Sequence, residues 1–205
     1  MGAPDRSFSF ALDAVTCTRM KFTRRTKTYD LDSLYEAAVG ALARKMRTVA
    51  ELKRMLRTRV AKQENGEVLV EAVVNRLKEQ RYLNDTNYAT AYSSFRRENE
   101  KFGKARVITD LKAKGVHNDV IEKTVSAAYE GIDEEKLARD YLNRKRVRKP
   151  ANQKESARTF RTLVRGGFST RTIFRILKNW DVEDEVLSVL ESEAVDSPPD
   201  GTDEP

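Results

Sequence analysis

The sequence predicts an all-α fold, organised as an elongated array of three tandem three-helix repeats. Nine successive segments between Leu31 and Trp180 carry apolar residues at the helical period, and they form three series of about 50 residues each. Only 39% of the chain is hydrophobic and 35% is charged, which leaves little material for one thick core. Units too small to be stable alone must share apolar faces with their neighbours, so we expect an extended architecture.

The first repeat is expected over residues 29–84. Its opening helix, over residues 31–45, has one apolar face, made of Leu31, Leu34, Tyr35, Ala38 and Leu42. The next helix is expected to start after Thr48. Thr48 and Glu51 have the spacing of a capping box, an arrangement in which two side chains satisfy two orphaned backbone N–H groups. An amphipathic run over residues 67–80 closes the repeat.

The second repeat is expected over residues 85–131, with Asp85 as the N-cap of its first helix. Its helical segments read TNYATAYSSFRREN, KARVITDLKAKG and NDVIEKTVSAAYE. The first of them presents Tyr88, Tyr92 and Phe95 on one face. The second stops at Gly115, because glycine accepts the left-handed backbone of a helix C-terminus.

The third repeat is expected over residues 132–184. It starts from a cap at Asp133, continues through QKESARTFRTLVRGG and ends with STRTIFRILKNW, which Ser169 caps. Gly166 and Gly167 are expected to end the middle helix for the same conformational reason as Gly115. On that middle helix, the apolar face is predicted to hold Ala157, Phe160, Leu163 and Val164.

The two ends of the chain differ in charge. Residues 1–28 are expected to form a basic arm or a short hairpin, since weakly alternating apolar residues occur there together with Arg19, Lys21, Arg24, Arg25 and Lys27. Residues 185–205 are expected to form an acidic, largely disordered tail, because ESEAVDSPPDGTDEP holds six acids, no base and three prolines. We expect both ends to be dispensable for folding.

Charge predicts an anionic partner. Lys and Arg number 39 against 32 for Asp and Glu, a formal net charge of +7. From Arg139 to Lys178 there are thirteen basic residues and only two acids. Spacings of four, three and four place four cations on one side of the middle helix of the third repeat: Lys154, Arg158, Arg161 and Arg165. Such cations repel one another unless an anion lies over them, so we predict that they bind the partner, together with Arg171 and Arg175 of the next helix.

A second basic region runs from Arg44 to Lys62, with eight bases and a single acid. Its predicted partner-binding residues are Lys53, Arg54 and Arg57. Two separated basic regions indicate a long contact surface and not one pocket.

Catalysis, cofactors and metals find no support in the sequence. Cys17 is the single cysteine and His117 the single histidine, and no phosphate-binding loop or nucleophile with a histidine partner occurs. Asp133, Glu134 and Glu135 are crowded, but at the first turn of a helix they favour the macrodipole. We expect a protein that is not an enzyme. No stretch approaches the roughly 20 apolar residues of a membrane span, so we expect a soluble, cytoplasmic monomer.

Four blocks of the sequence resemble the RecX regulatory proteins of bacteria, which modulate the RecA recombinase. They are RTVAEL at 47–52, VVNRLKEQRYLNDTNYATAY at 73–92, KFGKARVITDLKAKGV at 101–116 and LVRGGFSTRTIFRIL at 163–177. With their connecting helices they cover residues 31–180. The third repeat departs from the family pattern in KRVRKPANQKES, at 145–156, and the chain before residue 28 matches nothing in that pattern.

The resemblance implies a curved array of three-helix repeats that lies in the groove of the RecA filament on DNA. It implies contacts to neighbouring RecA protomers and inhibition of the ATPase, strand-exchange and co-protease activities, and so control of recombination, DNA repair and the SOS response. Single- or double-stranded DNA is a further possible partner through phosphate contacts. The resemblance does not assign individual basic residues to either partner.

A different class of protein fits part of the same pattern. Two helices joined by a glycine turn and rich in arginine are also typical of a helix-turn-helix protein that binds DNA without sequence preference. In that reading the sequence STRT, at 169–172, offers small hydroxyls and Arg171, which suit phosphate contact better than base readout.

Overall fold

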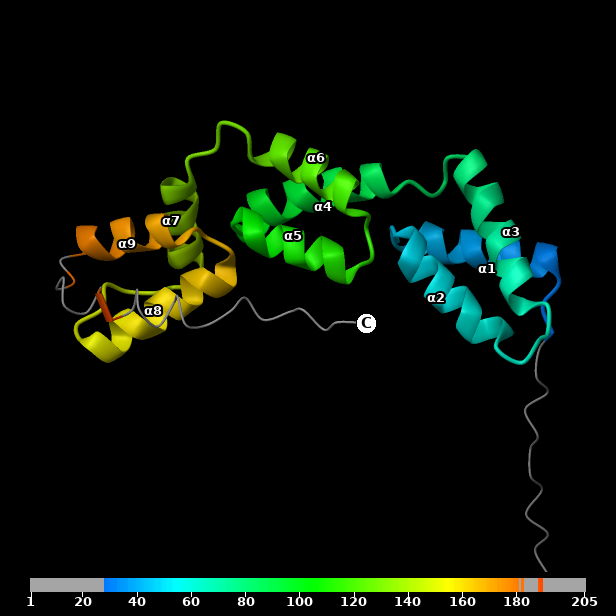
Figure 1. Ribbon diagram of the computed structural model, residues 1–205, viewed down its shortest axis with the longest axis horizontal. Coiled ribbons are helices and arrows are strands. Elements are labelled where there is room, and N and C mark those ends of the chain that lie inside the picture. The colour runs from blue at the N-terminus through cyan, green and yellow to red at the C-terminus, as the bar shows by residue number, and fades with distance from the viewer. Residues whose placement is uncertain (1–27, 181, 183–187, 190–205) are drawn as a thin grey trace, which may run out of the picture.

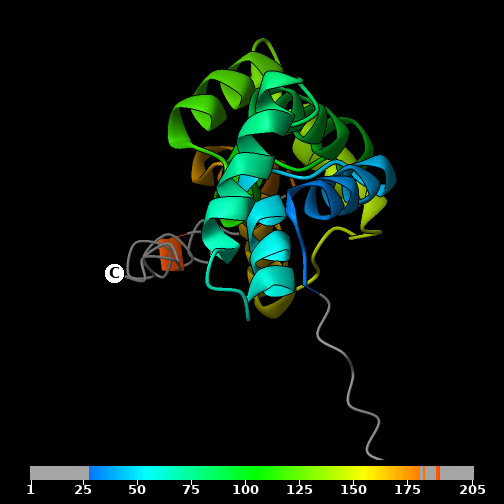
Figure 2. The same ribbon diagram turned by 90° about the vertical axis from the view of Figure 1, so that its right-hand side faces the viewer.

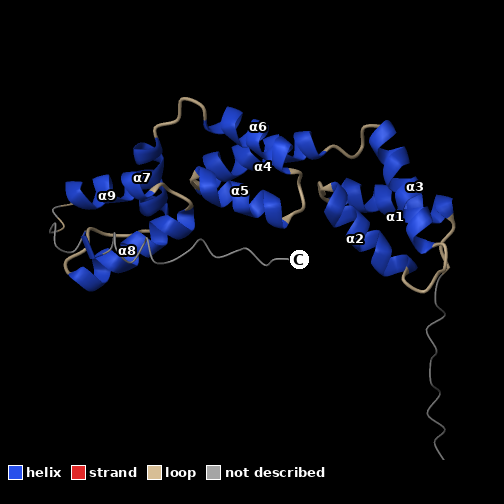
Figure 3. Ribbon diagram, in the orientation of Figure 1, coloured by secondary structure: helices blue, strands red, loops and turns tan. Residues whose placement is uncertain are grey.

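The computed structural model describes residues 28–180, 182, 188 and 189. The predicted all-α fold is confirmed, since this part of the chain holds nine helices and no strand (Figures 1 and 3). The helices are α1 (Leu31–Arg44), α2 (Val49–Val60), α3 (Gly66–Glu79), α4 (Asp85–Glu100), α5 (Lys104–Ala113), α6 (Asn118–Tyr129), α7 (Glu134–Arg144), α8 (Gln153–Gly166) and α9 (Thr170–Asn179). The expectations for the N-terminal arm, apart from residue 28, and for the acidic tail, apart from residues 188 and 189, lie outside the described residues.

The helices pack as three successive groups, each around its own apolar core. Leu52, Val70 and Leu77 lie in the core of α1 to α3. The core of α4 to α6 includes Val107, Leu111 and Ile121, and that of α7 to α9 includes Leu142, Leu163, Ile173 and Leu177. The groups follow one another along the long axis of the molecule, and the view along that axis in Figure 2 shows them one behind another. The repeat boundaries expected from the sequence remain predictions.

In the first two groups, two side chains predicted to be buried by their spacing are exposed, Leu31 and Phe95. Leu31 is the first residue of α1 and is 37% exposed. On α4 the buried positions are Tyr88, Ala89 and Ser93, so Phe95 points away from the core and is 54% exposed. In these two helices, therefore, the buried face is narrower than the set of apolar residues at helical spacing.

The predicted capping box of α2 is only half formed. Thr48 Oγ1 accepts a hydrogen bond from the backbone N–H of Glu51 at 3.1 Å, as predicted. The Glu51 carboxylate does not return to the helix start, because it pairs with the Lys114 ammonium of the next group at 3.0 Å. Asp85 is also not the N-cap of α4; Asn84 caps that helix by accepting from the Asn87 N–H at 3.0 Å.

Asp85 joins the first group of helices to the second. Its carboxylate accepts a hydrogen bond from the backbone N–H of Val49, the first residue of α2, at 2.9 Å. Burial raises the pKa of this carboxyl, and the Val49 N–H opposes that effect only in part. The fully buried Thr48 hydroxyl donates to the carbonyl oxygen of Lys114 at 2.7 Å. The N-terminus of α2 is thus capped twice, by Thr48, which precedes the helix, and by Asp85 of the second group.

Backbone hydrogen bonds join the second group of helices to the third. The N–H of Gly103 donates to the carbonyl oxygen of Gly166 at 2.8 Å, and the N–H of Ala105 donates to that of Gly167 at 3.2 Å. Gly167 ends α8 in the left-handed region, with φ of +83°, as predicted, whereas Gly166 is the last helical residue. A Cβ atom on Gly103 would lie 2.2 Å from the Gly167 carbonyl oxygen, so only glycine permits this approach.

Aromatic rings fill the same junction. The Phe102 ring lies 5.7 Å from that of Tyr141 and packs against the cores of both the second and the third groups. The Tyr129 hydroxyl donates to the Phe102 carbonyl oxygen at 2.8 Å, and burial raises the pKa of Tyr129 to about 12. Polar and apolar contacts together fix the second and third groups relative to one another.

Candidate partner-binding surface

The four predicted cations of α8 lie on the side of the helix that faces away from the core. The core-facing positions of α8 are Ser156, Thr159, Phe160, Leu163 and Gly166. At about 100° per residue, Lys154, Arg158, Arg161 and Arg165 all lie within about 40° of the direction opposite Leu163. All four side chains are exposed. We call them the α8 stripe.

The other edge of α8 departs from the prediction. Val164 was expected beside Leu163 on the buried face, but it is 48% exposed. The buried face is centred on Leu163 and includes Ser156 and Thr159. Val164 lies about 100° from Leu163 around the helix and so faces solvent. A polar side chain can be buried here because it bonds to its own helix, as Ser156 does by donating to the Asn152 carbonyl oxygen at 3.1 Å.

The α8 stripe is not neutralised within the described part of the chain. No carboxylate of the described residues forms an ion pair with Lys154, Arg158, Arg161 or Arg165. The exposed Arg171 of α9 is likewise without an ion pair among those residues. Like charges three and four residues apart raise each other's free energy, so this surface favours an anion.

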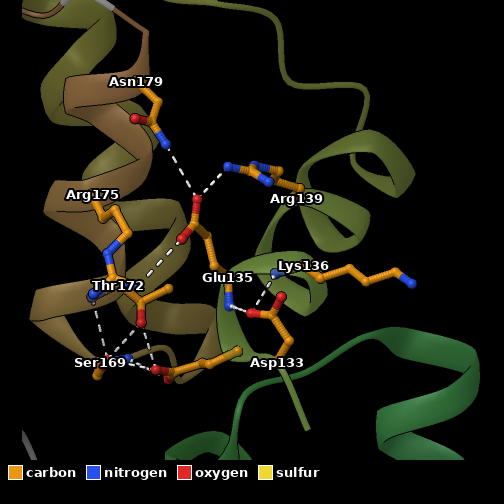
Figure 4. A network of polar contacts seen from close by, with 9 residues as sticks. Asp133, Glu135, Lys136, Arg139, Ser169, Thr172, Arg175 and Asn179 are labelled. Atoms are coloured by element: carbon orange, nitrogen blue, oxygen red, sulfur yellow. Dashed lines mark hydrogen bonds and ion pairs between the residues drawn. The ribbon is translucent and has the colours of Figure 1, made fainter.

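Arg175 differs from the other predicted cations because it is held by Glu135 of α7. Its guanidinium lies 3.4 Å from one carboxylate oxygen of Glu135, and the Asn179 amide donates to the other at 3.2 Å (Figure 4). Arg139 also pairs with this carboxylate. The structure therefore places Arg175 in the contact between α7 and α9, although half of its side chain, 51%, stays exposed.

The N-terminus of α9 is occupied by a carboxylate of the chain itself. Glu134 accepts hydrogen bonds from the backbone N–H of Ser169 at 2.8 Å and from its hydroxyl at 2.6 Å. The Thr172 hydroxyl donates to Glu134 at 2.6 Å. Burial acts to raise the pKa of Glu134, but these hydrogen bonds outweigh it and lower the pKa. The hydroxyls that seemed suited to DNA phosphates are thus taken by Glu134, whose negative charge would repel a phosphate at this helix end.

The predicted cations of the first group are mostly paired. Lys53 lies 2.5 Å from Glu71, and Arg57 donates to Glu67 at 2.9 Å. The hydrogen bond from Arg57 lowers the pKa of Glu67. Arg54 is exposed and makes no ion pair among the described residues. The structure does not bring these residues together with the α8 stripe, since α2 and α8 lie at opposite ends of the array (Figure 1).

The loop between α7 and α8 forms a basic hollow that was not predicted from the sequence. It encloses about 570 Å³ and is lined by the loop residues 145–149 and by Glu155, Arg158, Thr159 and Thr162 of α8. The run KRVRK, five residues with four cations, was the signal that could have identified it.

The four sequence blocks that carry the family resemblance supply the junctions between the groups. Thr48 and Glu51 come from the first block and Asp85 from the second. The third block supplies Gly103 to one junction and Lys114 to the other, and the fourth supplies Gly166. Residues of these blocks therefore join the groups of helices. Of the α8 stripe, only Arg165 lies in one of the blocks.

Among the described residues, no group of three or more His, Cys, Asp or Glu side chains is placed to hold a metal ion. In the same part of the chain, no helix combines the length and the apolar character needed to cross a membrane.

The sequence is similar to bacterial proteins that carry the same name, Regulatory protein RecX. No protein-family model matches the chain. The Regulatory protein RecX of Pseudomonas fluorescens is 30% identical over 155 residues, which cover 75% of this chain and 96% of that protein. The protein of the same description from Chromobacterium violaceum is 30% identical over 145 residues, covering 71% and 89%. That from Bacillus velezensis is 26% identical over 200 residues, covering 92% and 74%.

Two solved structures support the fold. The crystal structure of RecX from Lactobacillus salivarius matches with a TM-score of 0.55 at 23% sequence identity, covering 74% of this chain and 96% of that one. A second crystal structure, of a regulatory protein RecX, matches with a TM-score of 0.59 at 18% identity, covering 73% and 71%. At these identities the likeness concerns the helical fold.

Proposed function

The chain belongs to the RecX family of regulatory proteins, and from this premise we propose that it binds the filament of the RecA recombinase. By occupying the filament it inhibits the ATPase, strand-exchange and co-protease activities, and so modulates recombination, DNA repair and the SOS response. Inhibition by occupancy requires no active site, and the protein acts without a cofactor, as a monomer.

The α8 stripe is the observation that carries this proposal. Four exposed cations on one face of a helix, with no ion pair among the described residues, favour an acidic surface as their counterpart. Arg171 extends the same charge onto α9. Because arginine holds carboxylates through two parallel hydrogen bonds, the stripe suits the side chains of a protein face as well as it suits phosphates.

The joined groups of helices explain why an elongated body suits a filament. Side chain and backbone hydrogen bonds fix each group to the next, at Asp85 and Val49 and at Gly103 and Gly166. A body held in this way can contact more than one protomer of a filament. Each further contact is then made at high effective concentration, so that weak individual contacts give a tight complex.

The helix-turn-helix alternative is disfavoured at the position that it needs most. A recognition helix approaches DNA with its N-terminal residues. In this chain Glu134 occupies the N-terminus of α9 and uses the hydroxyls of Ser169 and Thr172. The exposed cations of the α8 stripe suit DNA phosphates as a second mode of contact beside binding to the protein.

A co-sedimentation experiment at physiological salt tests the proposal. The purified chain is mixed separately with RecA filaments on single-stranded DNA, with free RecA and with naked single-stranded DNA. We expect the chain to sediment with the filament at concentrations where it binds neither of the other two. Equal binding to naked DNA would contradict the proposal and support a plain DNA-binding protein.

A further inference from the structure

The basic hollow beside α8 is a folded part of the molecule. Its loop is fixed to the third group because the Val147 N–H donates to the Leu142 carbonyl oxygen at 3.0 Å and Val147 packs against the core of that group. The Arg146 N–H donates to the Asn143 carbonyl oxygen at 3.0 Å, and Arg146 takes the left-handed conformation, with φ of 55°. These bonds fold the start of the loop back against the end of α7.

Five cations line the hollow against a single carboxylate. The cations are Lys145, Arg146, Arg148, Lys149 and Arg158. The carboxylate belongs to Glu155, which already accepts a hydrogen bond from the Ala151 N–H at 2.8 Å. Arg146, Arg148 and Arg158 have no ion pair with any carboxylate of the described residues. A site of this kind selects an anionic ligand.

The chain itself contains a ligand of the required charge. Residues 190–205 hold six acids and neither Lys nor Arg. The six acids are spread over residues 191–204, so several carboxylates are available to several cations. In the basic region of the first group, by contrast, Lys53 and Arg57 are already paired with acids of α3.

The tether is long enough. Val182 packs against the core of the third group, so the chain leaves from the group that carries the hollow. The tether, residues 183–189, can span up to about 23 Å, and a helix of the length of α8 is about 21 Å long, so the ligand segment can begin at either end of α8. A segment tethered so closely acts at an effective concentration in the millimolar range.

We propose that residues 190–205 bind the basic hollow of their own chain as an acidic peptide ligand. Arg158 belongs both to the hollow and to the α8 stripe, so the bound segment covers one end of the stripe and competes with the anionic partner. The docking is independent of the proposed function, while the competition rests on it.

Zero-length carbodiimide cross-linking of the intact chain tests the docking, because the reagent joins carboxylates to lysines that touch them. We expect mass spectrometry to find cross-links from residues 190–205 chiefly to Lys145 and Lys149. In Arg148→Ala/Arg158→Ala these cross-links should fall at least severalfold, although both lysines remain. The matched control Arg44→Ala/Arg54→Ala removes the same charge from exposed sites of the first group and should leave them unchanged. Cross-links spread evenly over the lysines of all groups, or unaffected by the hollow substitutions, would overturn the proposal.

Neutralising the segment tests the competition. The intact chain with Glu191, Glu193 and Glu204 changed to Gln and Asp196, Asp200 and Asp203 changed to Asn should bind RecA filaments more tightly than the wild type. The gain is about tenfold if the segment is docked nine-tenths of the time. Unchanged filament affinity of this variant, together with the expected cross-links in the wild-type chain, would overturn the competition alone. Absence of the cross-links in the wild-type chain, with normal filament binding, would overturn the docking and leave the proposed function standing.

Discussion

The backbone N–H of Gly103 donates a hydrogen bond to the carbonyl oxygen of Gly166, although the two residues belong to different groups of helices. This contact needs close approach of two chain segments, and it is possible because Gly103 has no Cβ atom. The relative position of the second and third groups, and with it the position of the α8 stripe, depends on that approach.

Gly103→Ala should therefore destabilise the protein. Its Cβ would lie 2.2 Å from the Gly167 carbonyl oxygen, which is backbone and cannot rotate away. We expect a loss of about 1–3 kcal/mol in the free energy of unfolding, as for other overpacked sites, measured by urea denaturation. Gly40→Ala is the control, since nothing lies within 4 Å of its added Cβ and α1 is helical there. An equal effect of the two substitutions would contradict the account of this junction.

Asp85 at the first junction should weaken the protein as pH rises. Burial raises its pKa, so the folded state favours the protonated carboxyl. The stabilising contribution is complete below the unfolded pKa of about 3.9 and is lost as pH rises through the higher folded pKa. Asp85→Asn keeps the acceptor for the Val49 N–H without a charge. We expect its stability relative to the wild type to increase between pH 4 and pH 7, measured by thermal unfolding, and a constant difference would show that burial of the charge is not felt.

Glu134 should have the opposite dependence. Hydrogen bonds from Ser169 and Thr172 lower its pKa despite partial burial. Its contribution is present above the unfolded pKa of about 4.3 and is lost as pH falls through the folded pKa. Glu134→Gln should accordingly show less acid destabilisation than the wild type between pH 6 and pH 3. The exposed Glu122→Gln on α6 serves as control and should follow the wild-type curve.

Leu163 and Val164 are adjacent in sequence and should differ widely in importance. Leu163 is fully buried, so Leu163→Ala should lower the free energy of unfolding by about 2–5 kcal/mol. Val164→Ala removes a side chain that is 48% exposed and should cost well under half as much. Chemical denaturation of both variants decides this, and similar losses would mean that Val164 packs against a surface outside the described residues.

Periodicity predicted the helices because the pattern that it reads is local. The apolar positions of α2, α6 and α9 recur every three or four residues. The cations of α8 recur at the same spacing and therefore lie opposite the buried residues of that helix. Glycines at helix ends were also readable, since the left-handed conformation of Gly115 and Gly167 is a local requirement.

Contacts between groups were not predictable in this way. Asp85 has the composition of an N-cap, but its partner Val49 lies 36 residues away and is reached only through the packing of two groups. Glu134 and Ser169 are 35 residues apart, so the sequence could not show that the hydroxyls of α9 are occupied. Charge counting also could not show that Lys53 and Arg57, in the smaller basic region, are paired with acids of α3.

The affinity for RecA filaments of a chain without the α8 stripe tests the central claim most directly. Lys154→Ala/Arg158→Ala/Arg161→Ala/Arg165→Ala removes exposed side chains, each of which should change stability by no more than about 0.5 kcal/mol. The matched control, Lys78→Ala/Lys104→Ala/Lys112→Ala/Lys123→Ala, removes four exposed cations from the other two groups of helices, outside both basic regions. Circular dichroism first verifies that both variants are folded. We predict that the stripe variant loses at least tenfold in filament affinity and no longer suppresses RecA ATPase, while the control behaves as the wild type. Wild-type affinity of the stripe variant would contradict the assignment of the α8 stripe as the partner-binding surface.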